Sequence, residues 1–179
     1  MKNLLLLGTT VVVLSAVLPT AHGALPKQES ALPEYDKRAV AKRAVAPPAD
    51  RQAAESVLAA KVPGVKVSRD PLLGSARYVS PAKGFLTGVD GRGGSVSDEA
   101  LAAVPASDRH RVIKAFLNEH AAVMGHDATA LDSARVSRDY VTEHSGLRTV
   151  VWQQTQDDIP VFESVLIANV GREGQLISV

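Results

Sequence analysis

Residues 147–179 read LRTVVWQQTQDDIPVFESVLIANVGREGQLISV, and this stretch decides how the chain folds. It contains three runs of residues that favour β-strands. The runs are separated by turn signals at Asp157-Asp158 and at the Gly-Arg-Glu-Gly segment 171–174. The stretch therefore predicts an antiparallel meander, with at least one of the two glycines of 171–174 at a positive φ angle.

The middle run carries apolar side chains on both of its faces. Alternation puts Phe162, Leu166 and Val170 on one face, and Val161, Val165 and Ile167 on the other. Such a strand is predicted to lie centrally in its sheet, with one face on the core and the other covered by something else. Alternation alone does not decide which face is free. We take Val161, Val165 and Ile167 as the candidate interface.

The candidate core follows from the scarcity of aromatic residues. The chain has three Phe, three Tyr and one Trp, so Trp152 and Phe162 are a large share of its bulky side chains. We expect truncation of either to Ala to cost about 3–5 kcal/mol if it is fully buried. The predicted structural core consists of Trp152, Phe162, Leu166, Phe116 and Leu117.

Composition excludes several classes of function. The chain has 179 residues and a net charge of +1, which is no signature of nucleic-acid binding. It has no cysteine, which excludes disulfides, thiolate zinc sites and thiol nucleophiles.

The N-terminus has the pattern of a secretory signal peptide. Lys2 precedes an apolar run from Leu4 to Leu18, and Ala21-His22-Gly23 fits a cleavage site. The apolar run is shorter than the ~20 residues of a membrane span, so we expect no stable membrane anchor. Residues 1–23 are predicted to be a signal peptide, followed by a mobile Pro- and Ala-rich leader at 24–49. The mature chain is expected to be extracellular or periplasmic.

Residues 50–96 are predicted to form a helix, a β-hairpin and a connector. Asp50 is positioned to cap a helix that ends at Pro63-Gly64. The segments 65–69 and 75–80 alternate as the two arms of the hairpin. The glycine-rich segment 91–94 lacks the Lys-Ser or Lys-Thr of a phosphate loop, and we interpret it as a flexible connector.

Residues 97–179 are expected to form a second domain, truncated at its C-terminus, around the strongest helix signal. Ser107 is the predicted cap, and Gly125 suits a left-handed C-terminal cap. One helix face is apolar at three- and four-residue steps: Val112, Ile113, Phe116, Leu117, His120, Val123 and Met124. Asp127 is then positioned to cap a short turn. The predicted fold class is α+β, an antiparallel C-terminal meander packed against this main helix, with an extended N-terminal leader.

No catalytic or metal-binding constellation is visible in the sequence. The histidines have no HExxH spacing, and His120 lies on the apolar helix face, where a buried structural role is favoured. Asp157 and Asp158 occupy a turn, which supplies no cleft for acid–base chemistry. We predict no catalytic residues, no metal ligands and no cofactor in this chain.

Several motifs together resemble one family. The run Val-Val-Trp-Gln-Gln-Thr at 150–155, then Ile-Pro-Val-Phe at 159–162 and Gly-Gln-Leu-Ile-Ser-Val at 174–179, is similar to the fungalysin/thermolysin propeptide motif. Upstream, 69–74, 84–88 and the helix around 116–125 resemble leaders of bacterial fungalysin-type metallopeptidases. The chain departs from the motif at Asp158, where Gly is usual, which implies a non-glycine residue in left-handed backbone.

The resemblance implies the signal and propeptide region of a secreted zinc metallopeptidase precursor. It further implies an intramolecular inhibitor and folding assistant whose partner, in cis or in trans, is the peptidase catalytic domain. Zinc would be bound only by that domain, which carries HExxH and is missing from these residues. The alternative is a free-standing secreted peptidase inhibitor or protein-binding module.

Overall fold

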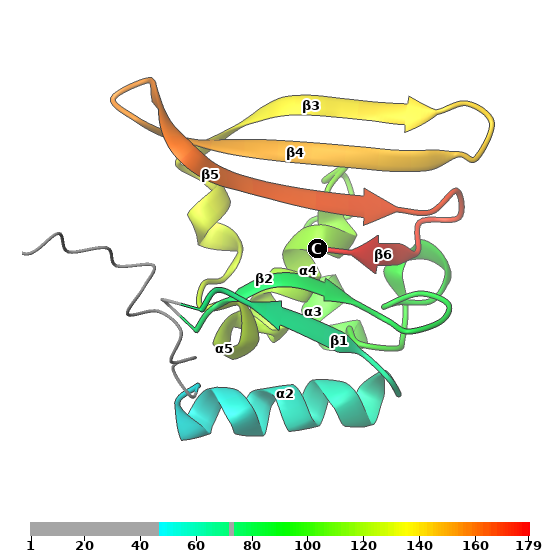
Figure 1. Ribbon diagram of the computed structural model, residues 1–179. Helices are drawn as coiled ribbons and strands as arrows, with labels where there is room; N and C mark the ends of the chain where they lie inside the picture. The colour runs from blue at the N-terminus through cyan, green and yellow to red at the C-terminus, as the bar shows by residue number, and fades with distance from the viewer. Residues whose placement is uncertain (1–46, 72–73) are drawn as a thin grey trace, which may run out of the picture. The chain divides into compact units, whose positions relative to one another are not determined.

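The computed structural model describes residues 47–71 and 74–179, all of which belong to one compact unit, Lys37–Val179 (Figure 1). The predicted signal peptide and nearly all of the predicted leader lie outside the described residues. The elements, in chain order, are α2 (Ala49–Lys61), β1 (Lys66–Arg69), β2 (Ala76–Ser80), η1 (Val89–Gly91), α3 (Asp98–Ala102), α4 (Arg111–Glu119), α5 (Ala121–Met124), η2 (Ala128–Leu131), β3 (Ala134–Thr142), β4 (Leu147–Gln156), β5 (Ile159–Val170) and β6 (Leu176–Ser178). The α+β prediction is confirmed. None of the described helices is long and apolar enough to cross a membrane.

The predicted meander is present as an antiparallel sheet in the order β3-β4-β5-β6. Asp157 and Asp158 form the β4–β5 turn with φ angles of 49° and 64°, so two non-glycine residues adopt left-handed backbone there. This is the backbone that a two-residue turn between right-twisted strands needs. Gly174, with φ 77°, confirms the expected positive φ in the β5–β6 turn.

The main helix is shorter than predicted and has a different cap. Ser107 does not cap it. Asp108 accepts a hydrogen bond from the backbone N–H of His110, and α4 begins only at Arg111. The helix stops at His120, whose φ and ψ of −110° and 29° are non-helical, and resumes as α5 up to Gly125, which has the predicted left-handed conformation with φ 85°. Residues 105–108 form a turn instead, in which the Asp108 N–H donates to the Pro105 carbonyl at 3.0 Å.

Helices α2 and α3 also differ from the prediction. α2 begins at Ala49 after Pro48, so Asp50 lies in its first turn and makes no side-chain cap. α3 was not predicted, although its cap has a recognisable signal. The Ser97 hydroxyl accepts a hydrogen bond from the N–H of Ala100 at 3.2 Å, and two acidic residues follow Ser97.

The core lies between the helices and the inner face of the four-stranded sheet. Phe116 and Leu117 of α4 are fully buried, and they belong to the same cluster as Val150 and Trp152 of β4. Leu166 packs against this cluster from β5. Phe162 was expected there, and this expectation is wrong, because its side chain is 88% exposed.

The residues just before the glycine-rich segment are bonded to the C-terminal segment. The Leu86 N–H donates to the Leu176 carbonyl, and the Asp90 N–H donates to the Glu173 carbonyl. At Gly94, φ is +66° and a Cβ would lie 2.6 Å from the carbonyl oxygen of Leu86, so only glycine fits without a shift. Flexibility was predicted for residues 91–94, and the chain immediately before them is held by a segment that is distant along the chain.

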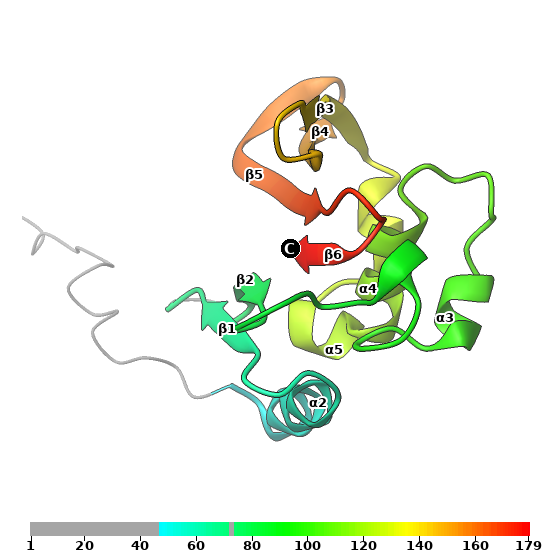
Figure 2. The same ribbon diagram turned by 90° about the vertical axis from the view of Figure 1, so that its right-hand side faces the viewer.

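The N-terminal hairpin meets the C-terminal sheet through one residue of each. Val79 of β2 and Val179 exchange two backbone hydrogen bonds, of 2.7 and 3.1 Å. β6 consequently lies between β5 and β2 in both views (Figures 1 and 2).

Candidate protein-binding surface

The strand that carries the predicted interface contains a wide bulge. Register along β4 and β5 passes from Gln153 opposite Val165 directly to Thr155 opposite Pro160. The four residues 161–164 therefore face a single residue of β4. Glu163, within this segment, has φ 55°, a left-handed conformation that is uncommon for a non-glycine residue.

The two glutamines that follow Trp152 hold this bulge. The Gln153 side-chain amide, Nε2, lies 2.7 Å from the carbonyl oxygen of Val161 and 3.1 Å from that of Ser164, and donates to both. Gln154 Oε1 accepts a hydrogen bond of 2.6 Å from the Ser164 hydroxyl. A bulge leaves backbone carbonyls without ladder partners, and the side chains of the neighbouring strand supply the missing donors.

In and beyond the bulge, the end of the β4–β5 hairpin presents apolar side chains to solvent. Ile159 is 69% exposed and Phe162 is 88% exposed. Val161, a predicted interface residue, is 37% exposed within the bulge, where simple alternation no longer assigns its face.

The outer face of the sheet carries the other two predicted interface residues. Ala168 and Leu166 face inward, since they lie opposite buried Val150 and Trp152. Val165 and Ile167 therefore point outward, and they are 49% and 47% exposed. The structure thus identifies the free face of β5, which the sequence pattern left open.

On the inner face, a cluster of charged side chains connects the sheet to the residues just before α4. Asp139 accepts two hydrogen bonds from Arg148, of 2.8 and 2.7 Å, and lies 3.2 Å from both Arg109 and His110. The paired N–H groups of Arg148 hold the pKa of Asp139 far below its ordinary value. The His110 ring packs edge-on against Trp152 with a centroid separation of 4.9 Å, and burial lowers the His110 pKa.

A second buried histidine, His120, connects the α4–α5 junction to Ser95, which directly follows the glycine-rich segment. His120 Nε2 donates a 2.7 Å hydrogen bond to the Ser95 carbonyl, and its ring lies 4.7 Å from that of Phe116. Desolvation lowers the pKa of His120. This buried His has the structural role that the sequence favoured.

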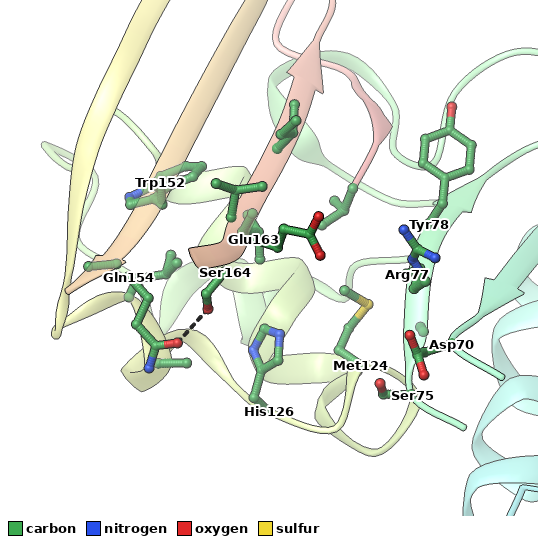
Figure 3. A pocket seen from close by; sticks show the side chains of 18 of the residues that line it. Asp70, Ser75, Arg77, Tyr78, Met124, His126, Trp152, Gln154, Glu163 and Ser164 are labelled. Carbon is green, nitrogen blue, oxygen red and sulfur yellow. Dashed lines mark hydrogen bonds between the residues drawn. The ribbon is translucent and has the colours of Figure 1, made fainter. Parts of the chain in front are cut away.

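A groove of about 970 Å³ opens beside the bulge (Figure 3). Glu163, Ser164 and Ile167 line it from β5, and Arg77 and Tyr78 line it from β2. Met124, His126 and Leu131 line it from α5, η2 and the segment between them. This groove was not predicted, because its two sides are far apart along the chain.

A cluster of metal-ligating side chains is not found in the described part of the chain. No group of three or more His, Asp or Glu side chains within residues 47–71 and 74–179 is arranged to hold a metal ion. The prediction that zinc belongs to another domain stays a prediction.

Part of the chain matches a known protein family. Residues 132–179 match the family model described as the Fungalysin/Thermolysin Propeptide Motif. The matched segment contains the whole four-stranded sheet, both glutamines and the bulge. The resemblance to the propeptides of such precursors is confirmed for these residues. No curated protein and no solved structure matches the chain.

Proposed function

We propose, from the propeptide motif at residues 132–179, that this chain is the propeptide region of a secreted zinc metallopeptidase precursor. In this role it binds the peptidase domain, slows its activity before maturation and assists its folding. The catalytic zinc belongs to the peptidase domain.

The observation that carries the proposal is the exposed outer face of β5. Val165 and Ile167 stand two residues apart on a strand whose opposite face is buried, so the strand is fixed in place while these two side chains contact solvent. Adjacent exposed apolar side chains on a rigid sheet are typical of a protein-binding surface.

The hairpin tip extends this surface. Phe162 is almost fully exposed, and the segment that bears it is held by the side chains of Gln153 and Gln154. A large aromatic side chain on a fixed backbone loses little conformational entropy when a partner buries it. Phe162 therefore suits an anchor in a pocket of the partner, which explains why so bulky a residue is not in the core.

The folding role follows from the same surface. A partner that binds only the folded peptidase stabilises it by mass action, and covalent linkage within a precursor raises its effective concentration. A domain with a prearranged face can therefore stabilise the folded peptidase as the peptidase forms.

The test measures peptide cleavage by the mature peptidase of the same precursor against increasing concentrations of this chain. We expect inhibition, with no peptidase activity and no stoichiometric zinc in the chain itself. Val165→Asp and Ile167→Asp should each weaken inhibition by at least about 30-fold, because an interface that buries a charge loses ~2 kcal/mol or more. Tyr140→Asp is the matched control, since Tyr140 is 51% exposed on β3, opposite Thr149 on the outer face and away from β5.

Undiminished cleavage at high micromolar concentration, together with no association by calorimetry, would remove support for the inhibitory role. An equal loss of inhibition in all three variants would show that the surface lies elsewhere.

A further inference from the structure

The junction between α4 and α5 holds the segment just after the glycine-rich residues through two consecutive side chains. Glu119, the last residue of α4, accepts a 2.6 Å hydrogen bond from the backbone N–H of Ser97. His120, the next residue, donates from Nε2 to the carbonyl oxygen of Ser95 at 2.7 Å. These two bonds join the end of α4 to residues 95–97, which lead into α3.

The His120 ring lies in a site that suits only its neutral form. The residue is 4% exposed, and its ring packs against that of Phe116. Because the Ser95 carbonyl can only accept, Nε2 carries the one N–H of the neutral ring. Protonation adds an N–H at Nδ1, an atom with no hydrogen-bond partner in the described part of the chain. A protonated ring would therefore bury both a positive charge and an unsatisfied donor, and each is unfavourable.

The charged groups around the ring do not compensate for an added charge. Glu119 and Lys61 of α2 both act on it. They form an ion pair with each other, so their opposite effects on the ring largely cancel. Its other neighbours, Phe116 and Ser95, do not titrate. Burial is the dominant effect, and it lowers the pKa of His120.

We propose that this junction is an acid-sensitive contact, in which protonation of His120 separates the end of α4 from residues 95–97. Water hydrates the charged ring once the two parts separate, so acid favours the separated state. This inference concerns the described residues alone and does not rest on the proposed function.

Glu119 reinforces the response at lower pH. Burial raises the pKa of its carboxyl, but the bonds from Lys61 and Ser97 lower it further, and the net shift is downward. The contribution of Glu119 is therefore complete above its ordinary pKa of 4.5 and is lost as the pH falls below that value.

The ordinary pKa of histidine sets the size of the effect. In the separated state the ring titrates near pH ~6.5, so at pH ~5 its charged form exceeds its neutral form by about 30-fold. Acid can therefore favour separation by at most about 30-fold at this pH, while Glu119 adds less than about twofold. His120 alone should consequently control the contact between pH ~7 and ~5.

The test measures amide hydrogen exchange of the full chain at pH ~7 and ~5, as protection relative to an unfolded chain. The Ser97 amide is the direct reporter, because its bond is to Glu119. We expect its protection to fall by about tenfold or more. In His120→Gln, whose uncharged amide can still donate to the Ser95 carbonyl, the fall should be less than about threefold. His144→Gln is the matched control, since His144 is exposed, and it should behave like the unchanged chain.

Two results would overturn the inference: protection at Ser97 that stays constant down to pH ~5, or an equal fall in His120→Gln and in the unchanged chain. Nuclear magnetic resonance of the His120 ring gives a second readout in the unchanged chain, which decides the matter if His120→Gln does not fold. Its titration midpoint should coincide with the loss of protection at Ser97, and clearly different midpoints would also overturn the inference.

Discussion

Gln153 is predicted to hold the β5 bulge, and its replacement by Glu tests this directly. Glu has almost the same shape as Gln, but an ionised carboxylate has no hydrogen to donate. In Gln153→Glu, the carbonyls of Val161 and Ser164 would lose their donor and face a negatively charged oxygen instead.

The magnitude follows from the two hydrogen bonds. Each contributes a net ~0.5–1.5 kcal/mol, so together they contribute about 1–3 kcal/mol. Val161 is partly exposed and its carbonyl can bond to water after the change, which favours the lower part of this range. We expect the free energy of unfolding to fall by about 1–2 kcal/mol.

The assay combines urea unfolding with residue-resolved hydrogen exchange. Exchange should accelerate at residues 161–164, while the buried amides around Val150 keep the protection set by global stability. Gln156→Glu is the matched control, since Gln156 lies exposed on the same strand, and this change should alter stability by no more than about 0.5 kcal/mol. If Gln153→Glu matched this control in both measurements, the side chain would not be what holds the bulge.

Other variants test the core, the charged cluster and the buried histidine. Trp152→Ala should lower the free energy of unfolding by about 3–5 kcal/mol, and Phe162→Ala should change it by less than about 0.5 kcal/mol; equal losses in urea melts would contradict the burial pattern. Asp139→Asn should cost about 1–3 kcal/mol at pH 7. Because the folded pKa of Asp139 is depressed, its contribution is complete above the unfolded pKa near 4 and should shrink as pH falls below it, and a pH-independent difference would argue against the ion pair. His120 has a lowered folded pKa, so the unfolded chain binds more protons below pH ~6.5, and stability should fall there as pH decreases. Thermal melts from pH 5 to 7.5 should show a weaker pH dependence for His120→Gln than for His144→Gln, which changes an exposed residue.

Sequence patterns correctly predicted the strands, turns and helix end that depend on residues close together along the chain. Alternating residues and turn residues placed the strands of the meander, and the apolar helix face identified Phe116 and Leu117, which are buried. Gly125 marked the end of the helix because few other residues tolerate its φ angle.

The errors arose where a distant segment decides the local structure. Phe162 was placed in the core by alternation, but the bulge at 161–164 interrupts that alternation, and the donor that stabilises the bulge comes from Gln153 on another strand. The glycine-rich segment was interpreted as flexible, and the sequence pattern did not reveal that Leu86 and Asp90, just before it, donate backbone hydrogen bonds to residues 176 and 173. The motif Trp-Gln-Gln identified the strand next to the bulge. Only the hydrogen bonds show that its two glutamines hold the bulge in place.

The pairing of Val79 with Val179, and of Leu86 with Leu176, also determines when folding can finish. Each pair joins residues about a hundred positions apart, and such non-local contacts are slow to form because a long loop must close first. During synthesis at ~5–20 residues per second, the N-terminal hairpin emerges seconds before its C-terminal neighbours. Until then β2 has no partner on that edge, and the Leu86 amide lacks its acceptor. The tertiary structure of the described residues is therefore completed only after β6 and Val179 have been made.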